Sequence, residues 1–361
     1  MQHGFLDLRP TPTANSVFAI GSLAASDARG ASRWDEFVLH CPNATFFHRS
    51  GWQQVLIEVF RYRTYFLYAE RAGTIEGVLP LAHLKSHLFG NRLTSLPFAV
   101  YGGVASTSPE AADALEAHAQ ALARTIGVDY LELRNVFPRH DDWPKEDVYF
   151  TFRKELSRDE DANMRAIPRK QRAMVRKGIA HGLTSEIDVD SSRFFALYSD
   201  NVHRHGTPAL PHRYFATLQR VFGNDCEILT VIDSNRRPLS SVLSFYFRHE
   251  VLPYYAGDDI SARELAANDF KYWELMRRAC ARGITMFDYG RSKRDTGPFS
   301  FKKNWGFKPE PLHYEFQLYR RDEIPRNNPA NPKYRMFIAL WRRMPLRLAN
   351  ALGPHIVRGL G

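Results

Sequence analysis

The chain has 361 residues, of which 44% are hydrophobic, and a formal net charge of +10. This length exceeds that of most single domains, so two domains of about 150 residues each, with extra end segments, are expected. The positive charge favours anionic partners such as nucleic acid, phosphorylated carriers or a membrane surface.

Residues 1–15 lack a continuous apolar run, and no stretch reaches the ~18 apolar residues of a membrane span. We therefore expect a cytoplasmic protein. The cysteines Cys41, Cys226 and Cys280 lie far apart and match neither a zinc-ligand spacing nor a disulfide framework. Reduced thiols, no metal site and no tightly bound cofactor are expected.

In chain order, residues 1–33 are polar and rich in Ala, Ser and Pro, which predicts a loose N-terminal arm. Trp34 begins the first helix, and residues 46–60 carry apolar side chains at helical spacing. Two alternating strands follow over residues 62–70 and 74–85, joined as a hairpin. A third strand ends near Leu96.

An amphipathic helix is predicted over residues 111–126 and a strand over residues 129–134, which completes a first domain of residues 34–155. The same order recurs downstream. It consists of a hairpin, the strand LPYYAGD (252–258), a helix that bears Phe270 and Trp273, and the strand ITMFDYG. Leu96 and Gly127 are 31 residues apart, as are Leu252 and Gly283, which indicates an internal repeat.

A hairpin, a splayed strand, a helix and another strand are the order of an acetyltransferase-type (GNAT-like) unit. The predicted fold class is α/β (α+β), with tandem GNAT-like domains, a cleft between them and a basic C-terminal helical tail. The second domain is expected at residues 156–320 and the tail at residues 321–361. The usual acyl-CoA loop, Arg/Gln-x-x-Gly-x-Gly/Ala, is missing, because residues 259–269 contain no glycine.

The stretch from Met286 to Tyr314 holds many chemically reactive residues between two predicted strands. Its glycines allow a ligand to approach the backbone closely, and its basic residues can bind phosphate or a developing oxyanion. These basic residues include Arg291, Lys293, Lys302 and Lys303. The alternative interpretation is that the glycines form turns, the aromatic residues are core and the lysines face solvent.

Several motifs resemble the Fem-type (FemAB) aminoacyl transferases, and specifically the relatives encoded with exosortase (PEP-CTERM) exopolysaccharide systems. They are GRS at 290–292, GPFSFKKNWGF at 297–307 and PEPLHYEF at 309–316, together with residues 203–215, 252–258 and 267–279. The resemblance covers roughly residues 35–320. It implies two GNAT-like units and transfer of an acyl or aminoacyl group to a cell-envelope precursor.

By this resemblance Phe301 and Lys302 lie at the acyl and phosphate end of the donor, and Lys302 stabilises negative charge in the transition state. Arg291 and Lys303 are expected to steer donor phosphates. The remaining donor-binding candidates are Tyr289, Ser292 and Trp305.

Asp258, at the end of a predicted strand, is the best-placed carboxylate to accept a proton from an attacking amine. His205 is a second catalytic candidate because it borders the expected inter-domain cleft, with a capping or structural role as the alternative. Arg169, Arg172 and Tyr255 are the acceptor-binding candidates. Arg169 and Arg172 fall at helical spacing with Arg165 and Arg176, which predicts one basic helix face. This face could instead be an ordinary solvated face.

From Asn331 to Gly361 there are six basic residues and no acidic one, with many apolar residues among them. Pro345 and Pro354 are expected to divide this tail into short helices. Its composition is typical of an interfacial amphipathic segment, so peripheral contact with an anionic membrane at its inner face is predicted. Packing of the tail on the body is the alternative.

The leading prediction is an acyl or aminoacyl transferase that forms an amide or ester on an amino sugar, glycan, nucleotide-sugar or lipid-linked precursor. Acyl-CoA or aminoacyl-tRNA is the expected donor substrate, so tRNA is a candidate partner. The alternatives are an acyl-CoA-dependent N-acyltransferase of the same fold, a non-catalytic membrane scaffold and a nucleic-acid-binding regulator.

Overall fold

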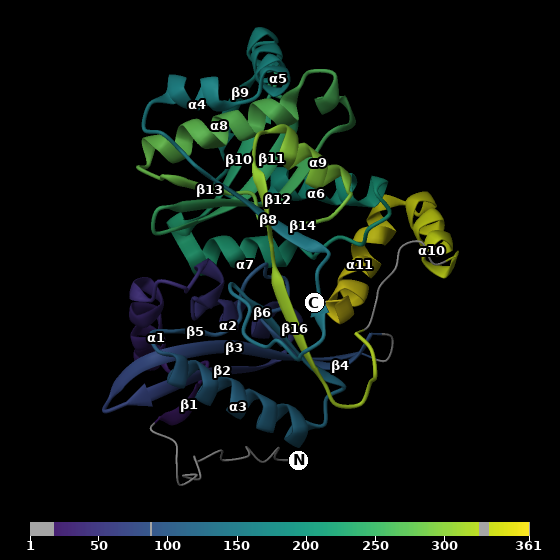
Figure 1. The fold of residues 1–361 in the computed structure, drawn as a ribbon. Helices are drawn as coiled ribbons and strands as arrows, with labels where there is room; N and C mark the ends of the chain where they lie inside the picture. Colours follow the sequence, from purple (N-terminus) through teal and green to yellow (C-terminus); the bar gives the residue numbers. More distant parts are fainter. Residues whose placement is uncertain (1–17, 87–88, 325–331, 361) are drawn as a thin grey trace. The chain divides into compact units, whose positions relative to one another are not determined.

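The computed structural model describes residues 18–86, 89–324 and 332–360 (Figure 1). The chain divides into two compact units. The first comprises Met1–Ile57, Arg61–Lys145 and Tyr314–Glu323, and the second comprises Glu58–Phe60, Glu146–His313 and Ile324–Gly361. The segment Tyr314–Glu323 therefore belongs to the first unit, although second-unit residues precede and follow it in the chain.

The first unit contains an eight-stranded sheet in the order β1-β2-β3-β4-β6-β16-β7, with β5 paired to β3. Its strands are β1 (Ala19–Leu23), β2 (Arg63–Arg71), β3 (Thr74–Ser86), β4 (Gly90–Ser95), β5 (Ala105–Ser106), β6 (Tyr130–Asn135), β7 (Lys145–Glu146) and β16 (His313–Leu318). Its helices are α1 (Ala28–His40), α2 (Gly51–Val55) and α3 (Pro109–Ile126), with a 3₁₀ turn at Phe46–His48. A π-helical turn at Leu56–Phe60 follows α2, and its residues Glu58–Phe60 are grouped with the second unit.

Local sequence explains the main elements of the first unit. Gly73 has φ +82°, which permits the tight turn of the β2–β3 hairpin. The α3 helix begins after Ser108, whose side chain accepts a hydrogen bond from the Ala111 amide, and ends at Gly127 with φ 67°. Its apolar face, including Leu115, packs in the core of this unit.

The second unit contains another eight-stranded sheet, in the order β14-β8-β13-β12-β11-β10-β9, with β15 paired to β8. Its strands are β8 (Tyr149–Glu155), β9 (Thr184–Ile187), β10 (Cys226–Ile232), β11 (Pro238–Phe247), β12 (Glu250–Asp258), β13 (Met286–Asp288), β14 (Ser292–Lys293) and β15 (Lys308–Pro311). Its helices are α4 (Glu160–Ala166), α5 (Arg169–Ala180), α6 (Ser192–Arg204), α7 (His212–Phe222), α8 (Ala267–Ala281), α9 (Gly297–Asn304), α10 (Pro332–Arg343) and α11 (Leu346–Leu360), with 3₁₀ turns at Gly223–Asp225 and Ile260–Arg263.

Helices cover both faces of this second sheet. Figure 1 shows α8 along one face and α6 and α7 on the other. This arrangement explains why nearly every residue of β11 is buried, without the alternation of a half-exposed strand. The core includes Phe287, Trp273 and Trp305, with Trp305 wholly buried.

The two units share the predicted element order. In each, an antiparallel hairpin leads to a further antiparallel strand, a helix follows, and the next strand pairs in parallel with the strand before the helix. The parallel pairs are β4 with β6 and β12 with β13. The predicted hairpins, the two long helices and the strands that follow them are present.

Several bounds differ from the prediction. Residues 19–33, assigned to a loose arm, contain β1 and the start of α1. The predicted domain boundary at residues 155/156 differs from the division near residue 145, because β8 pairs with β13, β14 and β15 of the second sheet. Residues 314–320 belong to the first unit, because β16 lies in its sheet.

Two predicted helical segments are interrupted. Pro168 separates α4 from α5, so Arg165 does not share one helix with Arg169 and Arg172. In the tail, Pro345 separates α10 from α11 as predicted, whereas Pro354 lies inside α11. Within the described residues, no helix is both long and apolar enough to cross a lipid bilayer.

Candidate active site

The second sheet opens between β12 and β13. These parallel strands pair only at Glu250 with Met286 and at Val251 with Phe287. Beyond these pairs β12 continues beside β11 to Asp258, whereas β13 ends at residue 288. In the part of the chain that the structure describes, no strand pairs with this edge of β12 beyond Val251. Main-chain groups at such an edge can bind an extended ligand.

Lys302 holds the loop that follows β13. Its side chain comes from α9 and is buried, and its Nζ donates to the carbonyl oxygens of Tyr289, Gly290 and Arg291 at 2.7, 2.9 and 3.1 Å. These bonds use all three N–H donors of an ammonium group. A direct contact between Lys302 and the donor, as expected from the sequence, would require one of these bonds to break.

Asp288 supports the same loop and was not identified from the sequence. Burial lowers the pKa of Lys302 to about 7, while the Asp288 carboxylate opposes this shift. Asp288 is itself buried and accepts hydrogen bonds from Thr151 Oγ1 at 3.0 Å and from the Gly290 amide at 2.7 Å. An acidic residue directly after the apolar pair Met286–Phe287 was the available signal.

The predicted donor residues Tyr289, Phe301 and Trp305 meet in one aromatic cluster with Tyr272. The Tyr272 ring centroid lies 4.9, 5.6 and 6.3 Å from those of Tyr289, Phe301 and Trp305, respectively. Within the described residues, the buried Tyr289 Oη and Ser292 Oγ have no hydrogen-bond partner. Buried hydroxyl groups normally have partners, so these atoms are available to a ligand or an ordered water.

Asp258 lies at the end of β12 and is paired with a buried lysine. Lys271, from the first turns of α8, is fully buried and lies 2.8 Å from Asp258 Oδ1. Ser240 also donates a hydrogen bond to this carboxylate. The ion pair keeps Asp258 in place at the open edge of β12, but it also occupies one oxygen of the carboxylate that was expected to accept a proton from substrate.

Asp269 is a second carboxylate near this edge, and sequence reasoning missed it. It lies in the first turn of α8, where it accepts a hydrogen bond from Trp305 Nε1 at 3.0 Å. Burial raises its pKa to about 6, although Trp305 and Lys271 favour the ionised form. A carboxylate with this pKa is ionised at neutral pH and binds a proton readily, which suits a general base. An acidic residue in a first helical turn is common and gave no distinct signal.

Asp269 also affects what the N-terminus of α8 can bind. Ala266 precedes the helix with φ 56° and provides no side-chain cap, and a 3₁₀ turn replaces a glycine-rich loop. Amide groups at a helix N-terminus usually attract phosphate. Here the nearby carboxylate adds negative charge, which disfavours a diphosphate at this position. The missing glycine motif and the negative charge of Asp269 therefore both argue against a diphosphate at the N-terminus of α8.

Three further predicted residues have exposed side chains. The Arg291 guanidinium lies 4.7 Å from the Tyr149 ring centroid, and Lys303 Nζ lies 5.8 Å from that of Phe299. His205 caps the end of α6, one residue after Arg204, whose guanidinium donates to the Asp258 main-chain carbonyl. His205 is thus near this site along the helix, but its ring makes no described contact with Asp258.

The predicted acceptor-binding residues do not form one group with the aromatic cluster. The Tyr255 hydroxyl lies 3.0 Å from that of Tyr214, and its ring packs against Phe215 on the α7 side of the sheet. Arg169 and Arg172 lie on α5, where Arg169 is exposed and Arg172 donates to the carbonyl of Arg165 at 3.3 Å. They remain candidate phosphate contacts on a basic surface.

In the first unit, the corresponding strand pair is closed by the protein itself. The Arg134 guanidinium pairs with Glu132 at 2.7 Å and donates to the carbonyl oxygens of Leu96 and Ala99 at 3.3 and 2.8 Å. These carbonyls belong to the segment that follows β4. In the first unit, the buried guanidinium therefore occupies the space beside the β4–β6 pair. The equivalent space beside the β12–β13 pair of the second unit is open, which favours the second unit as the site of chemistry.

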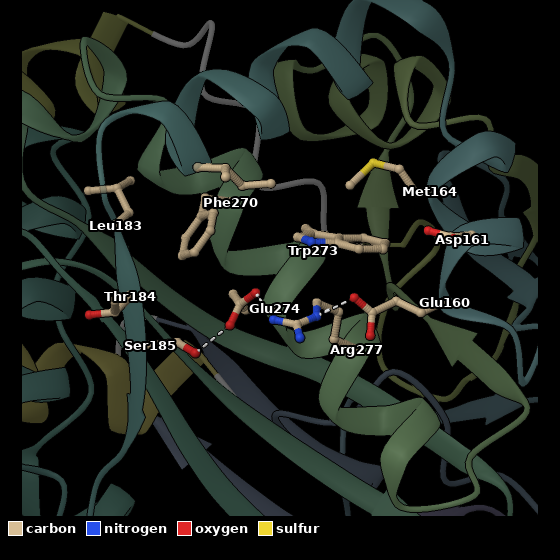
Figure 2. A pocket seen from close by; sticks show the side chains of 11 residues that line it. Glu160, Asp161, Met164, Leu183, Thr184, Ser185, Phe270, Trp273, Glu274 and Arg277 are labelled. Carbon is tan, nitrogen blue, oxygen red and sulfur yellow. Dashed lines mark hydrogen bonds and ion pairs between the residues drawn. The ribbon is translucent and has the colours of Figure 1, made fainter.

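Figure 2 shows an open pocket of about 490 Å³ elsewhere in the second unit. Three of its charged side chains pair with one another, since Arg277 joins Glu274 to Glu160, and Glu274 also accepts from Ser185 Oγ at 2.8 Å. None of the predicted site residues lines it. Among the described residues, no group of three or more His, Cys, Asp or Glu side chains could hold a metal ion.

Residues 163–303 match a family model described as an acetyltransferase (GNAT) domain. This range includes β12, α8 and β13 and ends inside α9. No curated protein sequence matches the chain.

Among solved structures, that of FemX covers 89% of this chain and 100% of its own, with a TM-score of 0.64 and 14% identity. A tandem GNAT protein from the clavulanic acid biosynthesis pathway covers 83% and 98%, with a TM-score of 0.52 and 11% identity. N-myristoyltransferase from Saccharomyces cerevisiae, with bound myristoyl-CoA, covers 87% and 82%, with a TM-score of 0.50 and 9% identity. These similarities establish the fold, and they confirm the predicted tandem GNAT-like architecture.

Proposed function

We propose that the protein is an acyl or aminoacyl transferase that forms an amide or ester on an amino sugar, glycan or lipid-linked precursor of the cell envelope. The observation that carries the proposal is the separation of β12 from β13 next to Asp269, Tyr289 and Lys302. This region lies within the segment that matches the GNAT model. The proposed acceptor class, and membership of the exosortase-associated subgroup, rest on the sequence motifs alone.

In the proposed reaction, the donor carbonyl lies in the gap between β12 and β13. The acceptor amine attacks the carbonyl carbon, a C–N bond forms, and the bond to a thiol or to a ribose hydroxyl breaks. Asp269 takes a proton from the attacking amine, and that proton can then pass to the leaving group. The chemistry needs no covalent enzyme intermediate.

Two lysines have positioning roles in this proposal. Lys302 keeps the carbonyl groups of residues 289–291 turned toward its ammonium group, which fixes the loop that carries Arg291 and Ser292. Lys271 holds Asp258 and favours ionised Asp269. Since Lys302 has no spare N–H donor, main-chain amides are better candidates than its ammonium group for binding the oxyanion.

We favour a donor substrate whose phosphates are not bound by the N-terminus of α8. Aminoacyl-tRNA is therefore the first candidate. Asp269 and the missing glycine motif support this choice. Acyl-CoA is the alternative donor, bound with its diphosphate elsewhere. Exposed basic residues such as Arg169 could contact either kind of phosphate.

The test is a side-by-side binding and transfer assay with acyl-CoA and aminoacyl-tRNA, at low and moderate salt, with an amino-sugar nucleotide as acceptor. Binding of one donor that is weakened by Lys302→Ala, with transfer from that donor lost in Asp269→Asn, would support the proposal and identify the donor class. Binding of neither donor would contradict it. That result, with partner proteins still captured by Lys302→Ala, would favour the non-catalytic scaffold.

A further inference from the structure

The C-terminal helices expose an unusual amount of apolar surface. Among the described residues, twelve large hydrophobic side chains are exposed, and six of them lie in α10 and α11. We call these six the tail apolar surface. They are Met336, Phe337, Leu340, Leu348, Leu352 and Leu360. A surface of this kind on an otherwise well-packed unit indicates a binding function.

In the part of the chain that the structure describes, these side chains are left exposed because each helix packs through another face. On α11 the buried positions are Ala349, Gly353, Val357 and Gly359, the first three of them spaced four residues apart, while Leu348 and Leu352 are exposed. A Cβ added at Gly353 would lie 3.0 Å from the carbonyl oxygen of Ala209, so this face of the helix touches the backbone of the second unit.

The α10 helix is anchored in the same way. Trp341 is buried, and its carbonyl oxygen lies 2.9 Å from His203 Nε2. Ile338 packs closely against Gly206, where an added Cβ would lie 2.5 Å from Ile338 Cγ2. Met336 and Leu340 are more than half exposed, at 64% and 60%. The exposed apolar side chains therefore belong to faces that point away from these contacts.

The positive charge of the tail indicates which kind of partner its apolar surface binds. Residues 331–361 contain six basic residues and no acidic one. Arg343 and Arg347 are exposed where α10 ends and α11 begins, between the apolar side chains of the two helices. A second copy of the chain would bring the same arginines face to face in a symmetric interface, with no carboxylate in this segment to offset them. An anionic lipid surface matches both features, because it accepts apolar side chains below a layer of negative charge.

We propose that the tail apolar surface and its arginines bind the interface of an anionic membrane. The helices lie on the membrane without crossing it, with leucines below the headgroups and guanidinium groups among the phosphates. This inference is independent of the proposed transferase activity, although it would bring the second unit to a surface where lipid-linked substrates are found.

The experiment is co-sedimentation of the full chain with vesicles of phosphatidylglycerol and phosphatidylcholine, and with phosphatidylcholine alone. Wild-type protein should bind the mixed vesicles, and its binding should weaken with salt. The variant L348Q/L352Q, which keeps charge and helix propensity, should bind about tenfold less, and R343Q/R347Q should lose most of the preference for anionic vesicles.

The matched control is L39Q/V189Q, which replaces two exposed apolar residues outside the tail, one in each unit, and should bind as the wild type does. Circular dichroism melting checks that all variants remain folded. Equal binding by wild type and L348Q/L352Q would overturn the proposal. So would a wild-type dimer, seen by light scattering, that L348Q/L352Q converts to monomer without any change in vesicle binding.

Discussion

At the scale of single residues, buried polar groups define the candidate site more sharply than exposed charges do. Lys302, Asp269 and Asp288 are each held by named partners, whereas Lys303 and Arg169 are exposed on the surface. Burying a charged or polar group is costly unless it is paired, so such groups persist for structural or chemical reasons. A structural role and a chemical role lead to different expected effects on stability and turnover when Lys302 or Asp269 is replaced.

Replacing Lys302 with alanine should lower both stability and turnover. Three carbonyl groups, two of them in buried hydrogen bonds, would lose their donor, which should cost about 3 kcal/mol in the free energy of unfolding. The displaced loop should lower turnover by about 100-fold, comparable to the loss of an oxyanion donor. Urea unfolding and steady-state rates measure the two effects. Ser300→Ala, at an exposed position of the same helix, is the control, and full stability with lost turnover in Lys302→Ala would instead indicate direct transition-state contact.

Asp269→Asn should change how stability depends on pH. The pKa of Asp269 is raised from 3.8 to about 6, so between these values the folded state binds more protons than the unfolded state. The free energy of unfolding therefore falls as pH rises from about 4 to 6. Asparagine removes this cost and still accepts the Trp305 hydrogen bond, so the variant should be about 2 kcal/mol more stable than wild type at pH 7 and equal near pH 4. Urea titrations at both pH values provide the check.

The same variant should be less active if Asp269 is the base. Wild-type turnover should rise with pH with an apparent pKa near 6, because only the ionised carboxylate accepts a proton. Asp269→Asn should lose this dependence and at least about 100-fold in rate. A more stable but inactive variant is the expected combination. An unchanged pH profile would remove Asp269 from the mechanism.

At the scale of elements, α6 packs closely against β12, the strand that borders the gap. A Cβ added at Gly257 would lie 2.3 Å from the Tyr198 amide nitrogen, a main-chain atom that cannot move alone. Gly257→Ala should therefore push α6 away from the strand and destabilise the protein by about 2 kcal/mol. Gly297→Ala is the matched control, since nothing lies within 4 Å of its added Cβ. Thermal unfolding of both variants tests the difference, and equal melting temperatures would contradict this account.

At the scale of the whole molecule, the sequence predicted the fold well, because periodic elements and the repeat follow from local pattern. It could not predict that β16 joins the first sheet, because strand pairing between residues so distant in the chain leaves no local signal. The candidate site was predicted only in part from the sequence. Motif residues such as Tyr289 and Lys302 do meet, but Asp269 and Lys271 gain their chemical interest from burial, which no spacing reveals.

The first unit should depend on β16, and Glu315 is the residue through which to test this. Glu315 is fully buried and accepts hydrogen bonds from Asn135 Nδ2 at 2.8 Å, His140 Nδ1 at 3.0 Å and the Arg139 amide at 3.0 Å. These contacts lower its pKa from 4.5 to about 2, and contacts with Glu315 and Glu116 raise that of His140 from 6.5 to about 9.

The signs of these shifts define a pH window. The contribution of Glu315 is complete above pH 4.5 and is lost as pH falls toward 2, whereas that of His140 is complete below pH 6.5 and is lost as pH rises through 9. Stabilisation is therefore greatest between these two limits. There, Glu315→Gln should lower the free energy of unfolding by about 3 kcal/mol, since each pKa unit corresponds to ~1.4 kcal/mol.

Hydrogen exchange can locate this loss, because the two units have separate cores. In Glu315→Gln, amides of β6 and β16 should exchange faster, while amides of α8 keep their wild-type protection. Glu310→Gln, at an exposed position of β15, should change neither set. Equal loss of protection in both units would mean that they unfold as one cooperative body. In that case the late strand would stabilise the whole chain and not only the unit that it completes.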